Sequence, residues 1–220
     1  MASVLALLLG SGLAAAAPRP SSEPARLLTF NVAGLPFIHP RWQLRLHAVA
    51  RRLKDAPYDV VALQEIWRDK DSRALAAESG FPYSARYDRN LEMGTGLLIL
   101  SRWPILEKHE VHFTCRPSIL RFPQGESIAN KGALMVRVDA PGGPLDVWTA
   151  HLISDYPDAR YRTLRLTQLF EFAEAVDRLS RGRPTVVLGD FNMTPEDTEY
   201  GLFADLLRSE ERRVGKECRL

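Results

Sequence analysis

Several short apolar runs in this sequence each end in a polar residue. Asn31 follows LLTF, Glu65 follows VVALQ, His151 follows VWTA, and Asp190 follows TVVLG. An apolar run of this length predicts a β-strand that is buried on both faces, which is typical of the middle of a layered α/β structure. Ligand sites in such structures form at the ends of strands. The sequence therefore predicts a layered α/β fold with a polar site at one edge of its strands.

Segments with helical periodicity separate these runs. One apolar stripe precedes Pro57, and a second precedes Gly182 and Pro184. The first stripe contains Trp42, Leu46, Val49, Ala50 and Leu53, and the second contains Leu166, Leu169, Phe170, Ala173 and Val176. Strands are expected at 59–67, 95–101, 132–138, 145–152 and 185–191. Because hairpin-like strand pairs alternate with strand–helix–strand units, we expect mixed sheets covered by helices.

The N-terminal segment has its own composition. Residues 1–17 are apolar and uncharged, and they end in alanines before Pro18. This pattern is typical of a secretory signal peptide, although the usual Lys or Arg before the apolar run is missing. A membrane span needs about 20 residues, and this segment is shorter. We therefore expect export, to a secreted or periplasmic location, rather than a short membrane anchor.

The rest of the chain divides into a linker, one domain and a tail. Residues 18–25 are rich in Pro and Ser and are expected to form a linker, and residues 26–208 are expected to form one domain. Residues 209–220 are charged and lack apolar periodicity, so we interpret them as a non-native or disordered tail. Cys115 is expected to be a free thiol, because the other cysteine, Cys218, lies in that tail.

The residue types at the strand ends suit one kind of chemistry. Magnesium prefers carboxylate and amide oxygens, so Glu65 and Asn31 are candidate metal ligands. His151 and Asn192 can donate hydrogen bonds to phosphate oxygens, and Asp190 can position or deprotonate a water molecule. Each residue alone has a simpler interpretation as a turn residue, a solvated carboxylate or a structural histidine. Their recurrence at successive strand ends favours metal-dependent phosphate chemistry.

Longer motifs surround these residues. They are NVAGLP at 31–36, LQEIW at 63–67, GTGLLILSRWPI at 94–105, TAHL at 149–152 and GDFNMTPED at 189–197. Together they resemble the endonuclease/exonuclease/phosphatase superfamily over about residues 26–207. The resemblance implies an α/β four-layer sandwich, in which two mixed β-sheets pack face to face with helices outside. It also implies that Glu65 and Asn31 hold Mg²⁺, that His151 and Asn192 bind the scissile phosphate, and that Asp190 orients the attacking water.

Three segments resemble the neutral sphingomyelinase-like phosphodiesterases of this superfamily. They are residues 151–176, residues 189–203 and the NKG at 130–132. This resemblance implies Mg²⁺-dependent hydrolysis of sphingomyelin or a related phospholipid by an activated water, with Lys131 near the phosphate. A solvated lysine at a strand edge is the alternative for Lys131. Pro36 counts against an abasic-site endonuclease, because those enzymes tend to carry Arg at this position.

Two other functions stay open, namely an exported nuclease of the same superfamily and a catalytically inactive module that binds phosphate or lipid. Lys plus Arg number 29 and Asp plus Glu number 27, so the net charge is only +2, which disfavours nucleic acid as the main partner. A monomer is expected. The segment 111–128 carries Phe113 and Phe122 beside Arg116 and Arg121. A loop that packs its two Phe side chains inward is the favoured interpretation, and contact with a membrane surface is the alternative.

One motif of the superfamily is not found after GDFNMTPED. This last motif, Ser-Asp-His or a variant, supplies the general base in the family and belongs to a closing strand. No histidine follows His151. The chain is therefore expected to be C-terminally truncated and inactive or nearly so, with an unpaired sheet edge that lowers its stability.

Overall fold

The computed structural model of the 220-residue chain describes residues 24–35, 39–87, 94–117, 130–154, 156 and 159–207. The segment expected to be a signal peptide, most of the linker and the charged tail lie outside the described residues, as do Pro36 and Phe122. Within the described ranges, no helix is both long and apolar enough to cross a bilayer.

In the described part of the chain, two four-stranded sheets form the centre, with strand orders β1-β2-β4-β3 and β5-β6-β7-β8. The first sheet contains β1 (Leu27–Asn31), β2 (Val60–Gln64), β3 (Tyr83–Arg86) and β4 (Leu98–Ser101). The second contains β5 (Ile105–His112), β6 (Gly132–Ala140), β7 (Gly143–His151) and β8 (Thr185–Asp190). β1 runs parallel to β2 and β7 runs parallel to β8, whereas the other neighbours are antiparallel. Both sheets are therefore mixed, as predicted.

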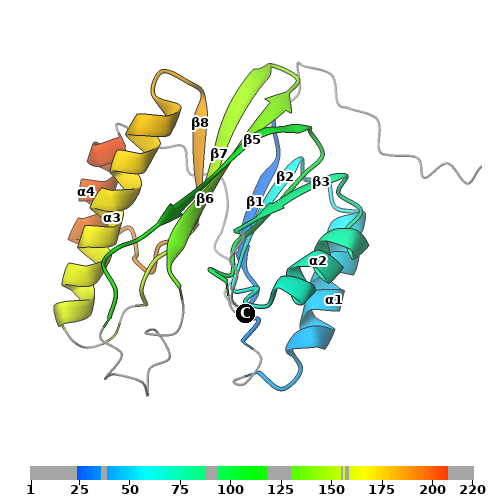
Figure 1. The fold of residues 1–220 in the computed structure, drawn as a ribbon, viewed down its shortest axis with the longest axis horizontal. Coiled ribbons are helices and arrows are strands. Elements are labelled where there is room, and N and C mark those ends of the chain that lie inside the picture. The colour runs from blue at the N-terminus through cyan, green and yellow to red at the C-terminus, as the bar shows by residue number, and fades with distance from the viewer. Residues whose placement is uncertain are drawn as a thin grey trace, which may run out of the picture.

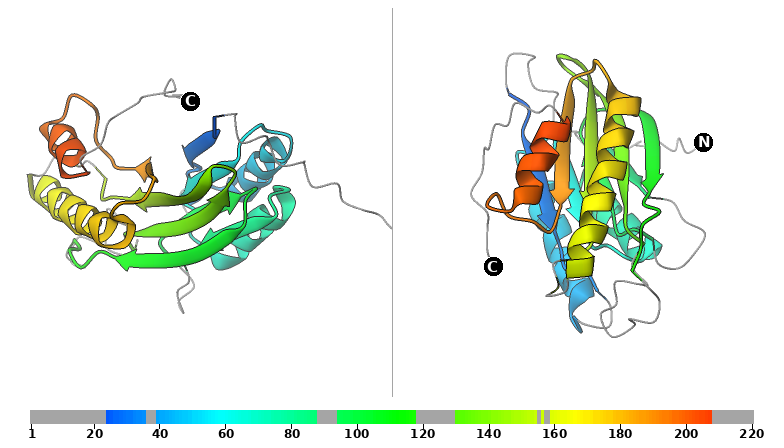
Figure 2. Two further views of the ribbon diagram at one scale, coloured as in Figure 1. Left: turned by 90° about the horizontal axis from the view of Figure 1, so that it is seen from above. Right: turned by 90° about the vertical axis from the view of Figure 1, so that its left-hand side faces the viewer.

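Helices cover the outer face of each sheet (Figures 1 and 2). α1 (Trp42–Lys54) and α2 (Asp69–Glu78) lie on the first sheet, and α3 (Ala159–Ser180) and α4 (Thr198–Leu207) lie on the second. Apolar cores fill the spaces between adjacent layers. The core between the two sheets includes Val60, Ile99 and Val136. The predicted four-layer sandwich is confirmed.

Burial corrects one assignment made from the helical pattern. Leu46, Ala50 and Leu53 of α1 are buried, as expected, but Phe170 of α3 is 50% exposed. Phe170 lies about 100° around the helix from the buried Leu169, so it points away from the sheet, and Phe172 takes the inward position instead. Phe113 is fully buried. For Phe113 the inward-packing interpretation is thus correct, and contact of this side chain with a membrane is excluded.

Strand pairing places the carboxyl ends of neighbouring parallel strands side by side. Asn31 lies opposite Gln64 in the β1–β2 pair, and His151 lies opposite Asp190 in the β7–β8 pair. β1 and β8 are outer strands of their sheets and contact each other across the sandwich. The carboxyl ends of strands from both sheets therefore meet at one end of the molecule.

Candidate functional site

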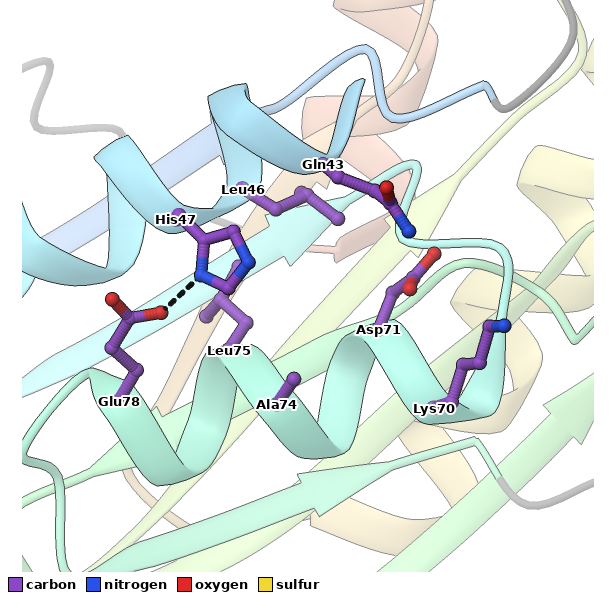
Figure 3. A pocket seen from close by; sticks show the side chains of 8 residues that line it. All are labelled: Gln43, Leu46, His47, Lys70, Asp71, Ala74, Leu75 and Glu78. Atoms are coloured by element: carbon purple, nitrogen blue, oxygen red, sulfur yellow. Dashed lines mark hydrogen bonds and ion pairs between the residues drawn. The ribbon is translucent and has the colours of Figure 1, made fainter. Parts of the chain in front are cut away.

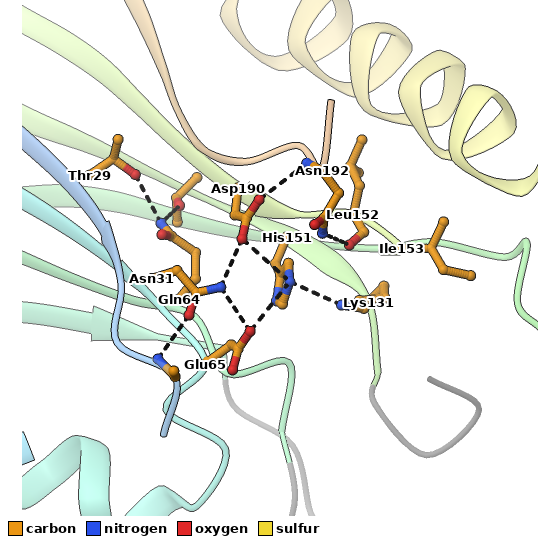
Figure 4. Close-up of polar contacts among 12 residues, drawn as sticks. Thr29, Asn31, Gln64, Glu65, Lys131, His151, Leu152, Ile153, Asp190 and Asn192 are labelled. Atoms are coloured by element: carbon orange, nitrogen blue, oxygen red, sulfur yellow. Dashed lines mark hydrogen bonds and ion pairs between the residues drawn. The ribbon is translucent and has the colours of Figure 1, made fainter. Parts of the chain in front are cut away.

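The polar residues predicted from the sequence gather where these strand ends meet (Figure 4). Asn31 ends β1, Glu65 follows β2, His151 ends β7 and Asp190 ends β8. Asn31 and Asp190 are 159 positions apart in the sequence, yet their side chains are hydrogen-bonded. The fold thus brings together the candidate residues that the sequence placed at separate strand ends.

Asn31 connects the two carboxylates of the site. Its Nδ2 donates to Oε1 of Glu65 and to Oδ2 of Asp190, and both distances are 2.8 Å. Its Oδ1 accepts a hydrogen bond from the backbone N–H of Ala33 at 2.9 Å. Glu65 follows a strand of one sheet and Asp190 ends a strand of the other, so the Asn31 amide joins the two sheets at the site. One NH₂ group thereby sits where two carboxylates converge.

Lys131 and His151 form the other side of the site. Lys131 is only 3% exposed, so the alternative of a solvated edge lysine is wrong. Its Nζ lies 3.1 Å from Nε2 of His151. Burial, and secondly the charge of Lys131, lower the pKa of His151 well below its usual 6.5. The imidazole is therefore neutral near pH 7, and Nε2 accepts a hydrogen bond from the lysine.

His151 is close to both carboxylates without bonding to them. Its Nε2 lies 4.0 Å from Oε1 of Glu65 and 3.9 Å from Oδ2 of Asp190, which is beyond hydrogen-bond distance. Its buried Nδ1 has no hydrogen-bond partner among the described residues. Since Nε2 accepts from Lys131, the proton of the neutral ring is assigned to Nδ1.

The GDFN turn is held by its own side chains. Oδ1 of Asp190 accepts from the backbone N–H of Asn192 at 3.1 Å. The side-chain Nδ2 of Asn192 donates to the carbonyl of Leu152 at 2.9 Å. The turn is therefore fixed against the residue that follows His151, and the second amide hydrogen of Asn192 is left for another acceptor.

Backbone strain is concentrated in this site. The non-glycine residues with positive φ in the described part of the chain are Ala33 (48°), Glu65 (66°) and Asn192 (50°). Such conformations cost about 1–3 kcal/mol each and persist where the surroundings impose them. A Cβ on Gly34 would lie 2.4 Å from the carbonyl oxygen of Glu65, and one on Gly96 would lie 3.2 Å from its Cα. Two glycines thus allow close packing around Glu65 and help to fix its backbone.

The sequence reasoning missed two supporting residues, Gln64 and Trp67. Nε2 of the buried Gln64 lies 3.1 Å from Oγ1 of Thr29 and 3.0 Å from Oγ1 of Thr149. It therefore links the two sheets beneath the site. The Trp67 ring is 6.0 Å from the His151 ring, and the Lys131 ammonium lies 5.8 Å from the Trp67 ring centre. Both residues belong to the LQEIW motif, which is the sequence feature that could have identified them.

The donor set suits a hard cation. No group of three or more His, Cys, Asp or Glu side chains in the described ranges is arranged as a ready metal site. The carboxylates of Glu65 and Asp190 nevertheless accept from the same NH₂ group. Two carboxylates and one amide are oxygen donors of the kind that magnesium binds, with water completing its shell. To act as a ligand, Asn31 would turn Oδ1 toward Glu65, because Nδ2 now faces it.

A separate groove of about 240 Å³ lies between α1 and α2 (Figure 3). Its lining includes His47, whose Nδ1 is 2.6 Å from Oε2 of Glu78. None of the predicted site residues lines this groove. The strand-end cluster, and not the groove, is therefore the candidate functional site.

Known proteins give an independent comparison. The model of the Endonuclease/Exonuclease/phosphatase family matches residues 28–216. A Drosophila melanogaster protein described as a candidate neutral sphingomyelinase is 31% identical over 180 residues, which cover 79% of this chain and 40% of that protein. The inositol phosphosphingolipids phospholipase C of Schizosaccharomyces pombe is 29% identical over 192 residues, which cover 82% and 45% respectively. The chain thus spans less than half the length of these relatives.

A solved structure agrees with the fold. A double mutant of beta toxin from Staphylococcus aureus with bound magnesium ions superposes with a TM-score of 0.66 at 20% identity, covering 84% of this chain and 70% of that one. Because the family model matches most of the sequence and the four-layer fold is present, the chain belongs to the endonuclease/exonuclease/phosphatase family.

Proposed function

We propose that this chain carries the metal- and phosphate-binding site of a magnesium-dependent phosphodiesterase that acts on sphingomyelin or a related phospholipid. The observation that carries the proposal is the meeting of Asn31, Glu65, Asp190 and His151 at strand ends of two sheets. The names of the two relatives support the lipid class. The magnesium ions of the beta toxin structure support the choice of cation.

Glu65 and Asn31 would hold the magnesium ion in this proposal. The strained backbone of Glu65 places its carboxylate beside the Asn31 amide and near Asp190. When bound, magnesium would neutralise negative charge on the phosphodiester. Gln64 and the neighbouring glycines would keep these ligands in place.

Lys131, His151 and Asn192 would bind the phosphate. Because His151 is neutral, the Lys131 ammonium is the cationic side chain of this group. Asn192 uses one amide hydrogen for the Leu152 carbonyl and offers the other to a phosphate oxygen. His151 can donate from Nε2 only as the other tautomer, with Lys131 turned to the substrate.

Hydrolysis joins a water oxygen to phosphorus and breaks the bond from phosphorus to the lipid oxygen. The water loses one proton and the departing lipid oxygen gains one, so the lipid leaves as an alcohol. Asp190 would orient this water. Binding of magnesium and phosphate is the part of this function that the described residues allow to be tested most directly.

Two measurements test the proposal. Magnesium titration calorimetry should show binding that Glu65→Gln abolishes and that Glu174→Gln keeps, because Glu174 is an exposed residue of α3. Release of phosphocholine from sphingomyelin vesicles, with magnesium or with EDTA, tests the substrate. Equal magnesium binding by both variants would contradict the proposed ligand set. Plasmid nicking faster than phosphocholine release would instead favour a nuclease.

Export and a monomeric state are also proposed. Residues 1–17 support export. N-terminal sequencing of the exported protein should then give a start near Pro18, and a start at Met1 would contradict cleavage. Light scattering should give the mass of one 24.7 kDa chain or of its processed form.

A further inference from the structure

Helix α1 presents a strongly basic outer surface. Its cations, together called the α1 basic face, are Arg41, Arg45, Arg51, Arg52 and Lys54, and all are exposed. No acidic residue occurs between Arg41 and Lys54. Since the whole chain has a net charge of only +2, this face is a local concentration of positive charge.

Contacts inside the protein do not account for this face. Within the described residues, Arg41, Arg51, Arg52 and Lys54 make no ion pair or side-chain hydrogen bond. The helix dipole favours the cations of the last turn, but it disfavours Arg41 and Arg45 at the other end, where the first turn has no acidic residue. Part of the face therefore acts against helix stability, which suggests an external partner.

An exposed apolar side chain lies within the face. Leu44 is 67% exposed, although Leu46 and Leu53 of the same helix are buried. Steps of 100° per residue place Leu44 near Arg41 and Arg51, on the side opposite Leu46. A leucine among cations suits the boundary between lipid head groups and acyl chains. A nucleic-acid backbone would be bound by the cations alone.

The face is also placed next to the site. Nη1 of Arg45 donates to the carbonyl of Val32 at 3.5 Å, and Val32 follows Asn31 directly. The nearby acidic residues Asp71 and Glu78 face the groove between α1 and α2 (Figure 3), where Glu78 contacts His47. Asp71 also accepts a hydrogen bond from Nε1 of Trp42. The two acidic residues do not neutralise the outer face of the helix by direct pairing.

We propose that the α1 basic face docks the protein on an anionic lipid surface, with Leu44 entering the head-group layer. The choice of a lipid partner rests on the proposed function, but docking does not require catalysis. Each Lys or Arg close to an anionic bilayer strengthens binding about fivefold. Reversing two of these charges should therefore weaken binding at least tenfold.

Co-sedimentation of the full chain with vesicles tests whether the α1 basic face binds anionic lipid. The vesicles contain phosphatidylcholine with or without phosphatidylserine. The test variant is Arg51→Glu/Arg52→Glu, and Arg51→Gln/Arg52→Gln guards against effects of the reversed charge on the helix. The matched control, Arg178→Glu/Arg183→Glu, changes exposed cations near the end of α3, in the opposite outer layer (Figure 1). Thermal unfolding checks that each variant is folded.

The full chain should bind phosphatidylserine vesicles, and its affinity should fall as the salt concentration rises. The affinity should be at least tenfold lower in the test variant and unchanged in the control. Leu44→Ser should weaken binding without changing its salt dependence. Equal losses in the test and control variants, or tighter binding to a DNA oligonucleotide, would overturn the inference. Vesicle binding by a chain that binds no magnesium in calorimetry would leave docking in place and count against the proposed function alone.

Discussion

Gln64 is the residue whose replacement best tests how the two sheets are held together at the site. Its Nε2 lies 3.0 Å from the hydroxyl of Thr149, which is fully buried. Leucine has a similar size but cannot donate a hydrogen bond. Gln64→Leu would remove the bonds of Nε2 to Thr29, Ala62 and Thr149. The bond to Thr149 contributes about 1 kcal/mol, and its loss leaves the Thr149 hydroxyl unsatisfied, which costs about 1–3 kcal/mol. We expect the free energy of unfolding to fall by about 2–4 kcal/mol.

A double-mutant cycle separates this cause from a general loss of packing. Thr149→Val removes the buried hydroxyl, so in Gln64→Leu/Thr149→Val both partners are apolar. The double variant should be more stable than Gln64→Leu alone, by about 1 kcal/mol. Urea unfolding followed by the fluorescence of the four tryptophans measures these differences. If the losses of the two single variants simply add up in the double variant, the inter-sheet hydrogen bond is not the cause of the destabilisation.

The remaining predictions concern the charges and the backbone of the site. Because His151 is neutral when folded but protonates near pH 6.5 when unfolded, the free energy of unfolding should fall as pH drops below 6.5, by up to about 1.4 kcal/mol per pH unit. His151→Gln should remove this pH dependence, which urea unfolding at several pH values measures. The same pH dependence in His151→Gln would contradict the assignment to His151. Lys131→Met should raise the pKa of His151 in an NMR titration. Gly96→Ala forces alanine into φ of +73° beside Glu65 and should destabilise the protein by about 1–3 kcal/mol, as thermal unfolding would show. Gly201→Ala in α4, with open space around it, should instead stabilise by about 0.5–1 kcal/mol.

The buried strands were predictable because their residues carry a strong local signal. Val60–Gln64 is apolar and buried at every position, so its composition alone indicates a central strand. The strand Ile105–His112 and the helix Asp69–Glu78 were not predicted. Half-exposed elements such as these contain many charged residues, and their apolar pattern is correspondingly weak. Their positions depend on packing against neighbours that are distant in the sequence.

The site residues were predictable as a set, but their contacts were not. The sequence placed Asn31, Glu65 and Asp190 at strand ends, and pairing brought those ends together. Nothing local in the sequence showed that Nδ2 of Asn31 donates to both carboxylates. The contact of Lys131 with His151 was equally hidden, because it is made beside Trp67, which follows a strand of the other sheet. Long-range packing therefore decides the charge state of the site.

The measurement that tests the central claim most directly is a titration with Mn²⁺, a paramagnetic substitute for magnesium, followed by NMR. If the strand-end cluster binds the metal, the side-chain amide signal of Asn31 and the imidazole signals of His151 should broaden first. Glu65→Gln should prevent that broadening, and the signals of His47 in the groove between α1 and α2 should keep their intensity. Broadening of His47 before Asn31, or broadening at Asn31 that Glu65→Gln leaves unchanged, would contradict the account.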